Sequence, residues 1–477
     1  MNKPRFNLIF ISLDTCRADH LGCYGSPEHA TPHLDTFSKH CLLFSNAFTH
    51  APSTLPSHST LFTSTYPSVH RADISTRTPL PKSLPTIATL LQRAGYATIS
   101  FNGGAQLDPA WNFSTGFDTY ETGESLDNNI TRACSWINEN PPMPFFLFLH
   151  GYDVHKSLKK IGPRFRAQFA NDDEAQKECT ALNARLKKNP IATERDTENY
   201  SKLYDDNLEI VDAALGTLFD FLDKTGLSNK TIVVIFADHG EEFGERGNVA
   251  LHSHTLYDEL LRVPLIIKIP GITPQKIDPL VGLIDVTPTI LESLQIPLPK
   301  TMQGKSLMPL ITGKDTIDRT ILSEFHYPAF EKISVRTRKH KLILTLHASY
   351  GDAFLKNQAF KEKTNKNTRI QRILERAKEP RTLFSFIFFF ALKKLRLYDL
   401  WITTTGPFKT YEFYNLEHDP KEETNHYYNN PPPARDYVTL LESFCNANKQ
   451  AQVTKTSQHM TINEDLQARL NELGYFR

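Results

Sequence analysis

The sequence of 477 residues has few cysteines and lacks long apolar runs. Its six cysteines are scattered with no Cys-x-x-Cys spacing, at Cys16, Cys23, Cys41, Cys134, Cys179 and Cys445. This pattern argues against a zinc ribbon or a disulfide framework, and it favours a reducing compartment. No stretch approaches the roughly 18 to 20 consecutive apolar residues of a membrane-spanning helix. A transmembrane segment is therefore not expected.

Net charge is also nearly absent, at +1, so the composition gives no overall bias toward nucleic acid. The opening stretch MNKPRFNLIFISLDTC has an apolar run too short for a signal peptide, and no small-residue cleavage site follows it. It predicts a first strand instead. We therefore expect a cytoplasmic protein, long enough for a large core and more than one domain.

Short apolar runs alternate with amphipathic segments along the first two thirds of the chain. The runs predict buried strands at residues 7–14, 97–104, 145–153, 231–240 and 263–271, and the segments predict helices that include 83–95 and 199–226. Strands that alternate with helices indicate an α/β fold, with a mostly parallel sheet and helices on both faces. Ligands of such sheets bind beyond the carboxyl ends of the strands.

Acidic and imidazole side chains stand where three of these predicted strands end. The first strand ends at Asp14, the third carries His150, Asp153 and His155, and the fourth ends at the pair Asp238 and His239. A single aspartate after a strand is usually a helix N-cap. The repetition at three strands instead favours a metal site at one edge of the sheet.

The stretch AFTHAPSTLPSHSTLFTSTYP, residues 47–67, gathers hydroxyls and histidines ahead of a predicted helix. One interpretation is a hydroxyl nucleophile at a helix N-terminus, where backbone N–H groups stabilise an incoming anion. The other is an N-cap and turn rich in serine and threonine. The stretch alone leaves both open.

The character of the chain changes after residue 320. Strand-like segments at 333–346 and 410–419 and helical segments near the C-terminus predict a smaller α+β subdomain over 321–477, after a first domain of residues 1–320. Between the strands, residues 353–396 hold twelve lysines and arginines against three glutamates, with the apolar run FSFIFFFAL. This segment either packs on the protein with its charges solvated or contacts anionic lipid headgroups.

Six motifs, in order, resemble the sulfatases of the alkaline-phosphatase-like superfamily. They are NLIFISLDTCRADHLGCYG, TPHLDTFSKHCLLFSNAFTHAPSTLPSHSTLFTSTYP, IVVIFADHGEEFGE, HTLYDELLRVPLIIKIPG, VGLIDVTPTILESL with QGKSLMPLI, and YEFYNLEHDPKEETN. The resemblance implies an alkaline-phosphatase-like mixed sheet, mostly parallel, and one divalent metal ion; two carboxylates and an imidazole suit Mn, Zn or Ca. It also implies that Asp14, Asp238 and His239 are metal ligands and that Thr54 is the nucleophile, itself on the metal.

Several histidines match the family's catalytic and substrate-contacting positions. His252 and His155 match histidines that contact the substrate or protonate the leaving oxygen, and with Thr54 and His58 they form the catalytic candidates. His254, two residues after His252, and His150 are candidates for substrate binding. The alternative is that His155, His252 and His254 are ordinary, solvated loop histidines.

The chain departs from typical sulfatases at the nucleophile. These enzymes carry cysteine or serine, oxidised to formylglycine, in a pattern C/S-x-P-x-R, whereas this chain reads Thr54-Leu55-Pro56-Ser57-His58. It also has Asp14-Thr15 where many sulfatases have paired aspartates. Both features resemble lipoteichoic acid synthases and phosphoethanolamine transferases, which use an unmodified threonine and a metal.

The resulting hypothesis is a metal-dependent hydrolase or transferase of phosphate or sulfate esters with a covalent intermediate on Thr54. One alternative is a true sulfuric ester hydrolase without formylglycine, and another is a catalytically silent binding protein with this fold. The expected partner is an anionic ester, a small molecule or a lipid, with peripheral membrane contact possible through residues 353–396. Nucleic-acid binding is not expected.

Overall fold

The structure is a computed structural model of the chain. It describes residues 6–27, 30–139, 141–155, 158, 160–327, 330–347, 408–429, 431–451 and 462–473. The basic segment 353–396 lies outside the described residues, so its predicted packing or lipid contact stays a prediction.

An eight-stranded sheet in the order β10-β2-β9-β7-β1-β6-β4-β5 forms the centre of the molecule. The strands are β1 (Asn7–Leu13), β2 (Leu42–Phe44), β4 (Ala97–Asn102), β5 (Thr119–Thr122), β6 (Phe145–Gly151), β7 (Thr231–Phe236), β9 (Leu265–Lys268) and β10 (Gln275–Ile277). β1 pairs in parallel with β6 on one side and with β7 on the other, whereas β9 runs antiparallel to β7 and β2. The expected mixed, mostly parallel α/β sheet is confirmed.

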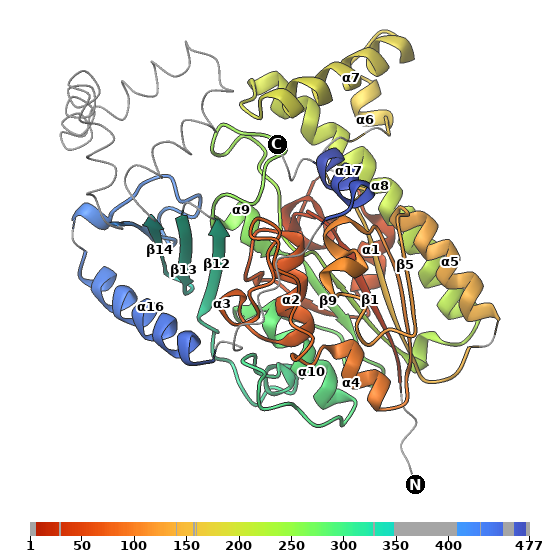
Figure 1. Cartoon of the computed structure of the whole chain (residues 1–477). Helices are drawn as coiled ribbons and strands as arrows, with labels where there is room; N and C mark the ends of the chain where they lie inside the picture. The colour runs from red at the N-terminus through yellow and green to blue at the C-terminus, as the bar shows by residue number, and fades with distance from the viewer. Residues whose placement is uncertain are drawn as a thin grey trace.

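Helices cover both faces of this sheet, as the alternating pattern predicted (Figure 1). One group packs around α8, and the other surrounds α2. The first group consists of α1 (Pro32–Ser38), α5 (Leu126–Asn138) and α8 (Glu194–Lys224); the second consists of α2 (Thr54–Thr63), α4 (Ile87–Arg93) and α10 (Val286–Ser293). All ten residues of α2 are buried, and β1, β6 and β7 are buried along their whole length. These central strands read as continuous apolar runs because both of their faces are covered.

Short elements complete the first part of the chain. A three-stranded sheet joins β11 (Val281–Gly282), β3 (Ala47–Phe48) and β8 (Arg262–Val263). The single strand predicted at 263–271 is divided, because Pro264 separates β8 from β9 and lacks the N–H that a continuous ladder requires. The remaining helices here are α3 (Pro67–His70), α6 (Pro163–Arg166), α7 (Asp172–Lys188), α9 (Asp258–Leu261) and α11 (Met308–Ile311).

A four-stranded antiparallel sheet follows, as Figure 1 shows to the left of the main sheet. It contains β12 (Ile321–Tyr327), β13 (Phe330–Arg336), β14 (His340–His347) and β15 (Phe408–Asn415), and α16 (Pro432–Ala451) packs on β13 and β14. The last described helix, α17 (Glu464–Glu472), returns to the main sheet, where Leu466 and Leu470 join the core of the first part. The predicted domain limits at 320 and 321 stay a prediction.

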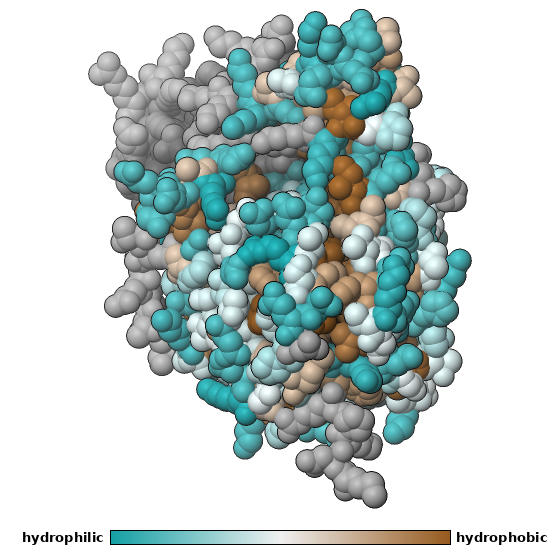
Figure 2. Space-filling model, turned by 90° about the vertical axis from the view of Figure 1, so that its right-hand side faces the viewer, coloured by the Kyte–Doolittle hydropathy of each residue, from teal (hydrophilic) through white to brown (hydrophobic). Residues whose placement is uncertain are grey.

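The described surface is mixed in character. The face in Figure 2 is mainly hydrophilic, with hydrophobic residues in narrow stretches. The large apolar side chains that are exposed are Met143, Leu298, Ile317, Tyr327, Tyr428 and Leu440. In the part of the chain that the structure describes, none of the helices has the length and apolar character needed to cross a bilayer.

Candidate active site

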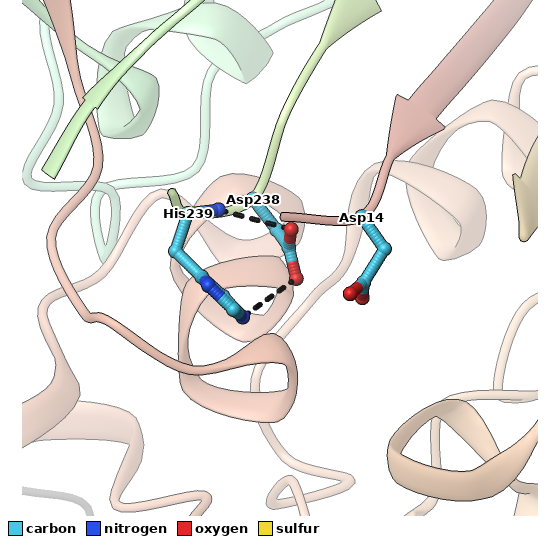
Figure 3. A group of neighbouring side chains, drawn as sticks. All are labelled: Asp14, Asp238 and His239. Carbon is cyan, nitrogen blue, oxygen red and sulfur yellow. Dashed lines mark hydrogen bonds and ion pairs between the residues drawn. The ribbon is translucent and has the colours of Figure 1, made fainter. Parts of the chain in front are cut away.

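Neighbouring strands β1 and β7 bring three of the predicted ligands to one edge of the main sheet. Asp14 follows β1, and Asp238 and His239 come shortly after β7. Because the two strands are parallel neighbours, their carboxyl ends lie side by side. Figure 3 shows the three side chains converging, and one ligand atom from each lies within 4.8 Å of the other two. All three residues are fully buried.

The hydrogen bonds of Asp14, Asp238 and His239 leave one possible ligand atom of each side chain available to a cation. Asp238 Oδ1 accepts from the backbone N–H groups of Thr15 (3.2 Å) and His239 (2.9 Å). His239 Nδ1 lies 2.8 Å from the carbonyl oxygen of Gly240, so in the neutral ring Nδ1 carries the hydrogen and Nε2 keeps its lone pair. Within the described residues, Asp238 Oδ2 and Asp14 Oδ1 are buried without a hydrogen-bond partner.

The two carboxyl groups have opposite pKa shifts. Burial and the neighbouring Asp238 raise the pKa of Asp14 well above its usual value. Burial opposes ionisation of Asp238 too, but the rings of His239, His58 and His150 hold its pKa below the usual range. The pKa of His239 is raised despite burial, because both aspartates favour the imidazolium. A cation shared by the two carboxylates would stabilise both in the ionised form.

The donor set fits a divalent cation. Two carboxylates and one imidazole suit Mn, Zn or Ca, and buried carboxylate oxygens without a partner are costly unless a ligand meets them. Thr15, where many sulfatases have a second aspartate, turns its hydroxyl away to the carbonyl of Val154 (3.1 Å). It therefore adds no ligand to the cluster.

Thr54 lies at this cluster as the first residue of α2. Its Oγ1 is 3.2 Å from Asp14 Oδ2 and 3.5 Å from His239 Nε2. Other hydroxyls of the stretch hold the helix in place: Ser57 Oγ, for example, donates to the carbonyl oxygen of Asp238 (2.7 Å). Helix α2 is thus buried beside the cluster, with Thr54 at its N-terminal end.

His58 and His150 bind to protein groups beside the cluster. His58 Nδ1 donates to the carbonyl oxygen of Thr54 (2.8 Å), and Nε2 lies 2.9 Å from Ser12 Oγ. His150 Nε2 donates to Asp14 Oδ2 (3.2 Å), and its Nδ1 accepts from the N–H of Gly103 (3.4 Å). Burial lowers the pKa of each imidazole to about 4, so both are neutral near pH 7.

His252 lies beside His239, and His155 lies beside His252. The ring of His252 is 4.6 Å from that of His239 and 4.9 Å from that of His155. Its Nδ1 is 2.9 Å from Glu241 Oε1, so Nδ1 donates to the carboxylate. His254 lies farther along the same loop and pairs through Nε2 with Glu242 Oε1 at 3.0 Å.

Three residues of this site were not identified as candidates from the sequence: Glu241, Ser12 and Gln106. Glu241 follows directly after Asp-His-Gly, which is a usable signal. Ser12 is a buried residue of β1 and pairs with His150 of the neighbouring strand β6. Gln106, described below, has no recognisable sequence signal.

Comparisons with known proteins agree with this fold. The family model described as Sulfatase matches residues 6–296, and the model described as N-sulphoglucosamine sulphohydrolase, C-terminal, matches residues 247–363. An ulvan-active sulfatase of Formosa agariphila is 27% identical over 344 residues, which span 66% of this chain and 66% of that protein.

Two solved structures share the fold. The phosphonate monoester hydrolase of Agrobacterium radiobacter superposes with a TM-score of 0.64 and 16% identity, over 97% of this chain and 99% of its own. A protein solved in complex with its substrate D-glucosamine-2-N,6-O-disulfate gives a TM-score of 0.65 and 18% identity, over 94% and 98%. The family match covers more than half of the chain, and the resemblance seen in the motifs is confirmed. The chain belongs to the sulfatase family of ester hydrolases.

Proposed function

We propose that the protein is a metal-dependent hydrolase or transferase of phosphate or sulfate esters that forms a covalent intermediate on Thr54. The observation that carries this proposal is the position of Thr54 Oγ1, 3.2 Å from Asp14 Oδ2 and 3.5 Å from His239 Nε2. A buried hydroxyl at a cluster of two carboxylates and an imidazole is the arrangement that an activated oxygen nucleophile needs.

Asp14, Asp238, His239 and Thr54 would hold the divalent cation. When bound, the cation lowers the pKa of the hydroxyl and neutralises charge on the transferred group. His150 and His58 act as positioning residues, since His150 fixes Asp14 and His58 fixes the first turn of α2 through the carbonyl of Thr54.

The reaction has two displacements at phosphorus or sulfur. Thr54 Oγ1 forms a bond to this centre while its proton passes to Asp14 Oδ2, which already accepts its hydrogen bond. The bond to the leaving alcohol breaks, and that oxygen takes a proton from His252 Nε2, whose imidazolium Glu241 stabilises at Nδ1. Water or an alcohol then attacks the threonine ester and gives a proton to His252, while Asp14 Oδ2 returns its proton to Thr54 Oγ1 as that oxygen leaves. His155 and His254 are the proposed substrate-contacting residues.

The preferred substrate class is a phosphomonoester or phosphodiester. A sulfated threonine lacks the aldehyde route by which formylglycine releases sulfate, so a threonine nucleophile suits phosphorus better. The related structure of a phosphonate monoester hydrolase supports this preference. Sulfate ester hydrolysis is the second candidate, supported by the family and by the ulvan-active relative.

The first experiment compares an aryl phosphodiester, an aryl phosphomonoester and an aryl sulfate on metal-loaded protein. We expect Thr54→Ala to lower phosphoester turnover by at least ~10³-fold, because it removes the nucleophile while Asp14, Asp238 and His239 remain. Thr54→Ser, which restores a hydroxyl, should recover part of this loss. Thr217→Ala serves as the control, since Thr217 is exposed and its Oγ1 bonds only within α8.

Two outcomes would contradict the proposal. Sulfate turnover that survives Thr54→Ala would indicate a water nucleophile in place of Thr54. Wild-type protein that turns over none of the three esters and retains no divalent metal after dialysis would favour the binding-protein alternative. Mass spectrometry of acid-quenched protein would check the intermediate, as a phosphoryl or sulfuryl adduct on Thr54.

A further inference from the structure

In one interpretation of the sequence, backbone N–H groups at this helix N-terminus stabilise an anion, but the first turn of α2 offers few such donors. The N–H of Leu55 donates to Gln106 Oε1 at 2.8 Å. Pro56, the next residue, has no N–H. Two of the first three positions of the helix therefore cannot donate to an anion at Thr54. Another donor is needed if this turn is to hold a phosphoryl or sulfuryl group.

Gln106 is fully buried and lies against the two residues that flank Thr54. Its Oε1 accepts from Leu55 N–H and, at 3.3 Å, from Ser53 Oγ. Since the N–H of Leu55 must meet an acceptor, this contact places the amide oxygen of Gln106 toward Leu55. The amide nitrogen, Nε2, then points away from that N–H. Nε2 is buried with no hydrogen-bond partner among the residues that the structure describes. Such an unmatched donor costs about 1–3 kcal/mol.

The turn that carries Gln106 is held in an unusual conformation. Gly104 and Ala105, the two preceding residues, have φ of 72° and 53°. For alanine this left-handed conformation costs roughly 1–2 kcal/mol. Tyr152 fixes the turn, since its hydroxyl donates to the carbonyl of Gly104 (3.0 Å), and Trp111 Nε1 donates to that of Ala105 (2.9 Å). Strain held by surrounding structure is common at functional sites.

We propose that the side-chain amide of Gln106 binds the substrate, donating from Nε2 to a non-bridging oxygen of the phosphoryl or sulfuryl group at Thr54. The amide replaces the donors that the helix lacks: its oxygen satisfies Leu55 N–H, and its nitrogen supplies two N–H groups. An anionic oxygen is a strong acceptor for a buried donor of this kind. The inference rests on the function proposed above, because it places the transferred group at Thr54.

The test measures binding of inorganic phosphate and inorganic sulfate to metal-loaded protein by calorimetry. Gln106→Glu keeps an acceptor for Leu55 N–H but replaces the NH₂ group by an oxygen that repels an anion. We expect Gln106→Glu to weaken binding of phosphate and sulfate by at least ~10-fold, and to lower kcat/KM for the aryl ester that the wild type turns over by a similar factor. Gln106→Met, which removes both polar atoms without adding charge, should also weaken binding. Metal content and melting temperature are measured for each variant.

Gln168→Glu is the matched control. Gln168 is exposed, and its replacement by glutamate makes the same change of charge away from the site. Phosphate affinity within two-fold of wild type in metal-loaded Gln106→Glu and Gln106→Met would overturn the proposal. So would the absence of any phosphate or sulfate binding by wild type. The two proposals fail differently: turnover that survives Thr54→Ala contradicts the nucleophile, whereas unchanged anion affinity in the Gln106 variants contradicts the amide.

Discussion

At the scale of single residues, the imidazole of His252 is fixed by its bond from Nδ1 to Glu241 Oε1 (2.9 Å). If His252 protonates the leaving oxygen, its removal should matter most when that oxygen is a poor leaving group. We expect His252→Asn and Glu241→Gln to slow turnover of a phenyl ester at least ~10-fold more than that of a 4-nitrophenyl ester. Steady-state kcat/KM for the two esters measures this.

The neighbouring pair Glu242 and His254 supplies the matched control. Glu242 is buried like Glu241, and it pairs with His254 at 3.0 Å. Glu242→Gln should leave the ratio between the two esters unchanged. Equal losses on both esters in His252→Asn would contradict the assignment of His252 as the general acid.

Buried histidines should also govern stability in acid. His70 accepts from Ala72 N–H at Nδ1 (3.0 Å), and its Nε2 lies 3.1 Å from Thr60 Oγ1. Burial lowers the pKa of His70 to about 3, below the ~6.5 of an unfolded chain. Between these values the unfolded state binds the extra proton, so the free energy of unfolding falls as the pH falls.

Replacement of His70 by glutamine should therefore flatten this dependence. We expect the slope of the unfolding free energy between pH 6.5 and 4 to decrease by up to about 1.4 kcal/mol per pH unit, the contribution of one proton. Urea unfolding at several pH values measures it, with the exposed His418→Gln as control. An unchanged slope in His70→Gln would show that His70 is not a source of the acid sensitivity.

The residues of the site differ in how well sequence reveals them. Asp14, Asp238 and His239 could be predicted as a group. Apolar runs in the sequence show where the parallel strands end, and the carboxyl ends of neighbouring parallel strands lie at the same edge of the sheet. Gln106 could not, since an amide in the turn GGAQL has no periodicity or charge pattern. Its importance depends on a bond to Leu55 N–H, which only the folded backbone brings near.

At the scale of elements, long apolar runs were predictable and short pairings were not. The predicted strands at 7–14, 97–104, 145–153 and 231–240 correspond to β1, β4, β6 and β7, each trimmed at its C-terminal end. β3, β8 and β11 have two residues each, too few to show a period. Such strands form because tertiary contacts align them.

The loop after β7 depends on a glycine that permits close backbone approach. A Cβ at Gly240 would collide with the carbonyl oxygen of Glu259. Gly240→Ala should therefore lower the unfolding free energy by at least ~2 kcal/mol and weaken metal binding, because the loop carrying His239 must shift. Thermal unfolding and metal titration measure the two effects.

Gly313 is the comparison for this change. It has φ of 69°, but beyond its two chain neighbours none of the described residues has an atom within 4 Å of the place that a Cβ would take, so Gly313→Ala adds backbone strain without a collision. It should cost about 1–2 kcal/mol and leave metal affinity unchanged. Equal metal affinity in Gly240→Ala and Gly313→Ala would contradict the role of close approach in placing His239.

At the scale of the whole molecule, the four-stranded sheet supports the loop that carries His252. Apolar side chains from both parts meet in one cluster, which contains Phe48, Leu256, Leu261, Leu280, Ile321, Phe325, Ile343, Tyr414 and Leu416. Tyr257, five residues after His252, donates its hydroxyl to Glu412 Oε2 of β15 (2.6 Å). Asp258 then binds Arg336 (3.0 Å) of β13. The end of the histidine loop is thus fixed by the C-terminal sheet.

Lys341 lies in the contact between the C-terminal sheet and the end of the histidine loop, which we call the junction. Its fully buried ammonium lies 2.8 Å from Asp258 Oδ1 and 2.8 Å from Glu422 Oε1. Asp258 and Glu422 raise the pKa of Lys341 in spite of its burial. Lys341→Met would leave the buried carboxyl of Glu422 without its cation, so we expect it to lower the unfolding free energy by about 3–5 kcal/mol.

Lys339 on the same chain segment provides the control. Its side chain is 65% exposed and its partner Glu417 is 3.4 Å away, so Lys339→Met should cost less than ~1 kcal/mol. Adding Glu422→Gln to Lys341→Met should restore part of the loss, because the second change removes the uncompensated charge. Urea unfolding of wild type, the two single variants at this pair and the double variant completes the thermodynamic cycle. If Lys341→Met costs no more than Lys339→Met, the junction is held by its apolar cluster alone, and the ion pairs contribute no net stability.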